Sequence, residues 1–180
     1  MEALIVIDML NDFVTGKLKV ERAKRIVPNI KRLIQVARTA DVPIIYANDA
    51  HLPTDSELKK WGKHAMKGTR GAEVIPQLKP NKGDYVLEKR TYSGFFETGL
   101  DLLLRELNVD SIVLTGLHAN MCIRHTAADG FFRGYRIVVP SDATEALSEQ
   151  EYQQGLEYLK EIYDAEITET DRLVRRWSGV

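Results

Sequence analysis

The segment "LTGLHANMCIRHTA" (residues 114–127) joins an apolar run to a helical pattern, and it contains the only cysteine of the chain, Cys122. The run that leads into it, "SIVLTG" (residues 111–116), is continuous rather than alternating in hydropathy, which is typical of a strand buried on both faces. The helical pattern "CIRHTAADGFFRGY" (residues 122–135) follows closely. A buried strand that leads into a helix is the repeating unit of an α/β fold with a parallel sheet.

The same unit recurs on both sides of this segment. Five further short apolar runs lie at residues 3–8, 43–49, 84–89, 136–142 and, more weakly, 165–168. Helical patterns separate several of them, at residues 21–40 (with Pro28 best placed near a first turn), 99–107 and 148–163. This alternation predicts a doubly wound, Rossmann-like, mostly parallel sheet of about six strands, with helices on both faces and right-handed crossovers. The exception is the polar stretch of residues 50–83, because compact domains rarely keep such a long loop without a use.

Composition narrows the class of protein. With 180 residues the chain has the size of one domain, which we expect to span residues 1–180. A formal net charge of -1 argues against nucleic-acid and anionic-membrane partners. One cysteine cannot form an internal disulfide, and the apolar run of residues 3–8 is too short for a transmembrane span or a signal peptide. These features predict a cytoplasmic protein.

Chemically useful side chains stand at the ends of the predicted strands. Asp8 ends the first run, Lys89 ends the third, and Cys122 follows the fourth. Asp49 ends the second run, with His51 two residues on. Because the carboxyl ends of parallel strands meet at one edge of the sheet, where ligands bind, we expect these residues to lie close together.

A carboxylate, an amine and a thiol at one edge suit the hydrolysis of a carbonyl compound. Cys122 attacks as a thiolate, which a helix N-terminus and a nearby Lys89 favour. Asp8 can accept the thiol proton and then give it to a leaving amine, while the backbone N–H groups of His118 and Cys122 can hold an oxyanion. The alternative is that Cys122 is a core residue and Lys89 a surface one. Against it, Asp8 lies in an apolar run, where burying a carboxylate costs free energy unless the group has a role.

Three stretches resemble the isochorismatase-like cysteine hydrolases: "LIVIDMLNDF" (residues 4–13), "KRTYSGFFETGLDLLL" (residues 89–104) and "LTGLHANMCIRHTAADGFFRGYRIVVPSDATEA" (residues 114–146). The resemblance covers nearly the whole chain and implies an isochorismatase-like fold. It implies a catalytic triad of Asp8, Lys89 and Cys122. It also implies a cis peptide bond between Leu117 and His118 that turns a backbone N–H into the oxyanion hole.

Two further motifs, "NDAH" (residues 48–51) and "WGKHAMKGTRGAE" (residues 61–73), resemble those of nicotinamidases. This resemblance implies that Asp49, His51 and His64 bind a divalent metal, zinc first with iron or manganese as alternatives, which coordinates the pyridine nitrogen of the substrate. It implies no organic cofactor. The aromatic residues that would wall the ring pocket are Phe13, Trp61 and Tyr92.

The resulting functional hypothesis is an amidohydrolase that converts nicotinamide to nicotinate and ammonia. The alternatives are an N-carbamoyl or ureide amidohydrolase, for which Arg70 and Arg90 could bind a substrate carboxylate, and another isochorismatase-like hydrolase; members that cleave a vinyl ether typically lack the cysteine. A non-enzymatic signalling or binding domain is a remote alternative, because Met9 follows Asp8 where phosphoacceptor modules need a second acid.

Family members are usually dimers or larger, so we expect a homo-oligomer. We interpret the C-terminal "DRLVRRWSGV" as a docked tail or a subunit contact.

Overall fold

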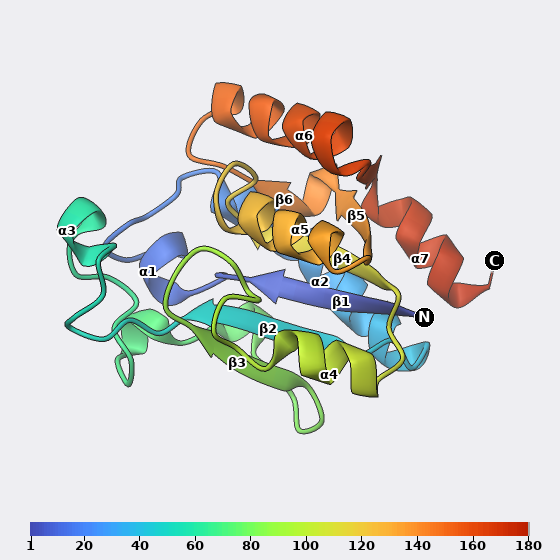
Figure 1. Cartoon of the computed structure of the whole chain (residues 1–180), viewed down its shortest axis with the longest axis horizontal. Coiled ribbons are helices and arrows are strands. Elements are labelled where there is room, and N and C mark those ends of the chain that lie inside the picture. The colour runs from blue at the N-terminus through green and yellow to red at the C-terminus, as the bar shows by residue number, and fades with distance from the viewer. Residues whose placement is uncertain (180) are drawn as a thin grey trace.

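The computed structural model describes residues 1–179, which contain one parallel seven-stranded sheet in the order β3-β2-β1-β4-β5-β7, with β6 beside β4. The predicted doubly wound α/β fold is therefore correct (Figure 1). The seventh strand, β6, is only two residues long and gives no recognisable run in the sequence. The strands are β1 (Glu2–Ile7), β2 (Ile44–Asp49), β3 (Tyr85–Lys89), β4 (Ser111–Leu117), β5 (Arg136–Pro140), β6 (Thr144–Glu145) and β7 (Glu166–Thr168).

Helices cover both faces of the sheet, as Figure 1 shows. On one face α2 (Ala23–Thr39) and α7 (Thr170–Ser178) pack over Leu4 and Val6 of β1. On the other face α4 (Leu100–Glu106), α5 (Cys122–Phe132) and α6 (Glu149–Tyr163) pack over Ile5 and Ile7. Successive side chains of β1 therefore enter two different cores, which is why its sequence is apolar without alternation. The remaining elements are α1 (Asn11–Val14), α3 (Leu58–Trp61) and the 3-10 turns Arg70–Ala72, Pro76–Leu78 and Ser141–Ala143.

Two helical details differ from the expectation. Pro28 lies inside α2 rather than in its first turn, because the helix begins at Ala23. The C-terminal residues form α7, which packs on α2 through Leu173 and places the Trp177 indole N–H 2.6 Å from a carboxylate oxygen of Glu2. The tail is therefore docked on its own chain. None of the helices within residues 1–179 is both long enough and apolar enough to cross a lipid bilayer.

The central strands approach each other closely where the site begins. Ile7, the last residue of β1, is paired with Gly116 of β4. Gly116 has φ 104°, and a Cβ at this position would overlap the carbonyl of Ile7. Only glycine fits here, since the position requires both a left-handed backbone and no side chain. This contact brings the residue after β1 next to the segment that leads to Cys122.

Candidate active site

Asp8, Lys89 and Cys122 meet at the carboxyl edge of the sheet. Asp8 follows β1, Lys89 is the last residue of β3, and Cys122 is the first residue of α5. The Lys89 Nζ lies 2.8 Å from a carboxylate oxygen of Asp8 and 3.6 Å from the Cys122 Sγ. Oxygen atoms of Asp8 and Asp49 and the Cys122 Sγ all lie within 4.8 Å of one another. The structure thus brings together three side chains that are far apart in sequence.

Asp8 is held in one orientation by its backbone and by two partners. Its φ is 54°, a left-handed conformation that asparagine and aspartate tolerate better than most residues but that still costs energy. One carboxylate oxygen accepts the backbone N–H of Asp49 at 2.8 Å, and the other faces Lys89. Burial raises the pKa of Asp8 to about 6, the neighbouring Asp49 acts in the same direction, and Lys89 opposes both. A carboxyl group with this pKa is suited to proton transfer near neutral pH.

Lys89 forms ion pairs with two buried carboxylates, those of Asp8 and Asp49. Its Nζ lies 2.5 Å from an oxygen of Asp49 as well as 2.8 Å from Asp8, and it donates to the carbonyl of Thr91 at 3.3 Å. Burial acts to lower the pKa of Lys89, but Asp49 and Asp8 outweigh burial and raise it. Lys89 is therefore a permanent cation in the site.

The Cys122 thiol is neutral at rest. Its residue is only 5% exposed, and burial raises the pKa of the thiol; Lys89 acts to lower it, while Asp8 and Asp49 raise it further. The expected stabilisation of a resting thiolate by the helix N-terminus and Lys89 is therefore outweighed by burial beside two carboxylates. A thiol in this state becomes a nucleophile only if a base removes its proton, and an Asp8 carboxylate oxygen lies within 4.8 Å of the sulfur.

The segment between β4 and Cys122 forms a tight, hydrogen-bonded turn. The peptide bond between Leu117 and His118 is cis, and the carbonyl of His118 accepts the N–H groups of Met121 and Ile123. Ala119 donates to the carbonyl of Glu145 in β6, so the short strand that the sequence did not reveal fixes this turn. Within residues 1–179 the backbone N–H groups of His118 and Cys122 form no hydrogen bond in the loops and turns, and none to a side chain. Burial lowers the pKa of the His118 imidazole to about 4, so this ring is neutral.

A second cluster adjoins the first. Asp49, the last residue of β2, lies near His51 and His64 of the following loop, and one potential ligand atom from each falls within 4.8 Å of the other two. The His51 Nδ1 is 3.0 Å from an oxygen of Asp55, and the His64 Nδ1 is 2.8 Å from the carbonyl of Gly62. The His51 Nε2 is buried and makes no hydrogen bond within residues 1–179, although an oxygen of Asp49 lies 3.5 Å away. Imidazoles held at one nitrogen while the other is left unpaired are typical of metal ligands.

Two acidic residues of this region were not recognised from the sequence. Asp55 contacts His51, and its only signal in the sequence is its position four residues after that histidine, in "HLPTD". Glu57 places a carboxylate oxygen 3.9 Å from the His51 Nε2, and its other oxygen is buried without a hydrogen-bond partner among the described residues. Around the cluster, within residues 1–179, the carboxylates of Asp8, Asp49, Asp55 and Glu57 surround Lys89, Arg90 and His51. Burial acts to lower the pKa of the His51 imidazole, but Asp49 and Asp55 outweigh burial and raise it to about 9.

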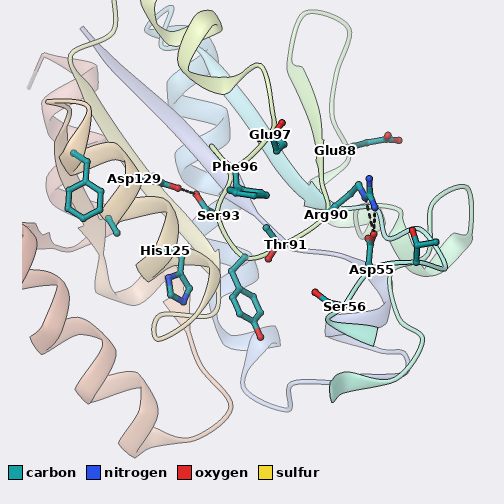
Figure 2. Close-up of a pocket in the computed structure, with 14 residues that line it drawn as sticks. Asp55, Ser56, Glu88, Arg90, Thr91, Ser93, Phe96, Glu97, His125 and Asp129 are labelled. Carbon is teal, nitrogen blue, oxygen red and sulfur yellow. Dashed lines mark hydrogen bonds and ion pairs between the residues drawn. The ribbon is translucent and has the colours of Figure 1, made fainter. Parts of the chain in front are cut away.

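The two arginines considered for a substrate carboxylate lie elsewhere. Arg90 binds Asp55 through Nε at 2.9 Å and Nη2 at 2.5 Å, as the dashed lines of Figure 2 show. Arg70 lies in a 3-10 turn, accepts the Asn11 amide through its carbonyl and lines a groove with Pro76. Neither side chain lines the cavity between Phe13 and Met121, the residue before Cys122.

That cavity has a volume of about 350 Å³ and is lined by Phe13, Lys17, Leu18, Lys19, Trp61, His118, Met121 and Leu147. Phe13 packs edge-on against both His64 and His118, so the cavity adjoins His64 of the second cluster and the turn that precedes Cys122. Tyr92 lies on the other side: its hydroxyl accepts the Trp61 indole N–H at 3.0 Å, and its ring stacks on His125 in the larger groove of Figure 2. Phe13 and Trp61 thus share a cavity, whereas Tyr92 lines the larger groove and contacts this cavity only through its hydrogen bond to Trp61.

Asp12 fixes the loop that carries His64. Its buried carboxylate accepts the backbone N–H of Ala65 at 2.8 Å, and Gly71 packs directly against it. A Cβ on Gly71 would overlap this carboxylate and force it off Ala65.

We therefore expect Gly71→Ala to lower the free energy of unfolding by about 1–3 kcal/mol, the usual cost of overpacking, and to loosen the position of His64. Chemical denaturation measures the change. Gly99→Ala is the matched control, since a Cβ there meets no atom within 4 Å and the backbone is not left-handed. Equal stability of the two variants would show that Asp12 does not constrain the loop.

Comparison with known proteins places this geometry in a family. The Isochorismatase domain family matches residues 2–172. N-carbamoylsarcosine amidase from Thermoplasma acidophilum is 43% identical, with a TM-score of 0.90 over 94% of this chain and 96% of that chain. Nicotinamidase 3 of Arabidopsis thaliana is 32% identical over 86% of this chain and 78% of its own length. The pyrazinamidase of Pyrococcus horikoshii in complex with zinc is 26% identical, with a TM-score of 0.88 over 93% of this chain and 98% of that chain. The chain therefore belongs to the isochorismatase family.

Proposed function

We propose that the protein is a cysteine amidohydrolase that hydrolyses nicotinamide to nicotinate and ammonia. The observation that carries the proposal is the arrangement of Asp8, Lys89 and Cys122, in which the sulfur lies 3.6 Å from the ammonium and within 4.8 Å of the carboxylate. A nucleophile, a base and a fixed cation in contact are the parts that acyl transfer requires. The nicotinamidase and N-carbamoylsarcosine amidase among the relatives support the cleavage of an amide-type C–N bond.

The proposed reaction has two halves. Asp8 takes the thiol proton as the Cys122 sulfur attacks the carboxamide carbon, and the N–H groups of His118 and Cys122 stabilise the oxyanion. The C–N bond then breaks, and Asp8 returns the proton to the departing ammonia, which leaves a thioester. Water attacks the thioester with Asp8 as base, which releases nicotinate and restores the thiol. Lys89 keeps Asp8 ionised at the start of each half.

The residues present fit a divalent metal beside this centre. The unpaired, buried His51 Nε2 points to a missing partner, and two imidazoles with one carboxylate suit zinc, iron or manganese. Asp49, His51 and His64 would hold the ion, whose role when bound is to coordinate the pyridine nitrogen and orient the ring. The zinc complex of the Pyrococcus horikoshii pyrazinamidase supports this assignment.

A second substrate class is favoured by one observation. The cavity lined by Phe13, Trp61 and His118 is mainly apolar but contains Lys17 and Lys19, and no carboxylate of the described residues lines it. Lys19 is paired with Glu21 at 2.6 Å, so Lys17 is the better candidate for a substrate carboxylate. An N-carbamoyl amino acid would supply such a group, and the N-carbamoylsarcosine amidase among the relatives makes this class worth testing.

Ammonia release from nicotinamide, pyrazinamide and N-carbamoylsarcosine distinguishes the two classes. We expect the highest kcat/KM with nicotinamide, loss of that activity on removal of metal by a chelator, and recovery with Zn²⁺. A preference for the N-carbamoyl acid that Lys17→Met abolishes would favour the second class instead. Failure to release ammonia from any of the three would contradict the proposed amidohydrolase.

We also propose, from the sequence alone, one domain that forms a homo-oligomer in the cytoplasm. Light scattering of the purified protein tests the oligomeric state directly, and a mass equal to one chain would contradict it.

A further inference from the structure

Asp55 is a buried carboxylate with a partner on every side. Its side chain is 4% exposed. One oxygen lies 3.0 Å from the His51 Nδ1 and accepts the backbone N–H of Leu52 at 3.0 Å. The other oxygen accepts both Nε and Nη2 of Arg90, and Figure 2 shows the guanidinium turned towards it at the margin of the larger groove. A carboxylate taken out of water must be paired in this way, so its position is fixed by the fold.

The contact with Asp55 decides which nitrogen of His51 is available. An ionised carboxylate accepts hydrogen bonds only, so the Nδ1 of His51 must carry a proton. The Nε2 is then the nitrogen left for a metal: it is buried, it makes no hydrogen bond within residues 1–179, and an oxygen of Asp49 lies 3.5 Å away. His64 is oriented through the same nitrogen but by a neutral acceptor, the carbonyl of Gly62. The two histidines therefore differ in the charge of the group that accepts their Nδ1 proton: a carboxylate for His51 and a neutral carbonyl for His64.

We propose that Asp55 is a positioning residue of the metal site: it fixes the tautomer and ring orientation of His51 and increases the donor strength of its Nε2, and Arg90 holds Asp55 in place. The proposal rests on the metal site of the proposed function but not on its substrate. A carboxylate behind a ligating imidazole makes the other nitrogen a better ligand, and loss of such a partner commonly weakens metal binding about 10–100-fold.

The test is the zinc affinity of the full chain, measured by competition with a chromophoric chelator. We expect Asp55→Ala to bind Zn²⁺ about 10–100-fold more weakly than the unaltered protein. Asp55→Asn keeps an oxygen that can accept from His51 and should lie between the two. The absorption spectrum of the Co²⁺-loaded protein should also change in Asp55→Ala, because the spectrum reports the ligand field, to which a purely structural role would not contribute.

Two controls separate positioning from a general loss of structure. Ser56→Ala alters the exposed neighbour of Asp55 and should leave the zinc affinity unchanged. Arg90→Gln leaves the contact between Asp55 and His51 possible and should weaken zinc binding less than Asp55→Ala. If Asp55→Ala is poorly folded by circular dichroism, the spectrum and affinity of Asp55→Asn decide the matter alone.

The outcomes also distinguish this inference from the proposed function. Wild-type zinc affinity and an unchanged Co²⁺ spectrum in the Asp55 variants would overturn the positioning role while leaving the metal site intact. Absence of zinc binding by the unaltered protein would overturn both the metal site and the role of Asp55. Zinc binding that depends on Asp55, in a protein that does not hydrolyse nicotinamide, would support the inference and contradict the substrate.

Discussion

Replacing Cys122 by alanine is expected to abolish amide hydrolysis and leave the fold in place. The sulfur lies 3.6 Å from the Lys89 Nζ and within 4.8 Å of an Asp8 oxygen. Its removal ends the proposed covalent route, so kcat should fall by about 10⁴-fold or more, as when other enzymes lose a nucleophile. Alanine is a good helix former and is only one atom smaller, so the start of α5 should persist. Steady-state ammonia release and thermal unfolding by circular dichroism measure the two effects.

The same position allows a measurement that does not depend on the substrate assay. Because Cys122 is the only cysteine of the chain, labelling by a thiol reagent reports this residue alone. We expect labelling of the folded protein to be slowed by bound substrate. Cys122→Ser is the matched variant, since it keeps the size of the side chain but supplies a much weaker nucleophile, and it should be as inactive as Cys122→Ala. Retention of a substantial part of the activity by either variant would show that the sulfur is not the nucleophile.

Much of the fold could be predicted because this sheet is buried on both faces. Residues 3–8 and 111–116 are continuously apolar since their side chains enter two cores, and this pattern marks a parallel strand. The two-residue strand β6 could not be predicted, because Thr144 and Glu145 have no periodicity to detect. Helix α7 was interpreted only as a docked tail or a subunit contact, since its apolar face is short: Leu173 is buried, and Val174 and Trp177 pack partly buried against the same core.

The part of the site that could be predicted from the sequence is the part formed by residues at the ends of strands. Asp8, Asp49 and Lys89 stand at the carboxyl ends of adjacent strands, so a parallel sheet brings them together whatever the loops do. The partners of loop residues depend on how the chain folds back. Arg90 follows Lys89 directly and was considered, under the N-carbamoyl alternative, as a partner of a substrate carboxylate. It instead binds Asp55, whose position no pattern in residues 50–83 reveals.

Replacing Lys89 by methionine is expected to cost both activity and stability. The Lys89 ammonium is the cation shared by Asp8 and Asp49, and methionine keeps the length of the side chain without the charge. Two buried carboxylates would then face each other unpaired, and breaking a buried ion pair costs about 3–5 kcal/mol. In the absence of Lys89 the pKa of Asp8 should rise well above its present value of about 6. Asp8 would then be protonated at neutral pH, could not accept the thiol proton, and kcat should fall by about 10³-fold or more.

The pH dependence of the unfolding free energy identifies this cause. A carboxyl group whose pKa is raised by folding binds more protons in the folded state, so the stability it contributes is present at low pH and is lost as pH rises through the folded pKa. Metal-free Lys89→Met should therefore be closest to the unaltered protein near about pH 5 and fall furthest behind it near about pH 8. Denaturant unfolding of both proteins after chelation measures the difference, and Lys82→Met, at an exposed position, should show none. A deficit for Lys89→Met that stays constant with pH would mean that lost packing, rather than two unpaired carboxylates, accounts for the effect, and Lys89 would then not be the charge that keeps Asp8 ionised.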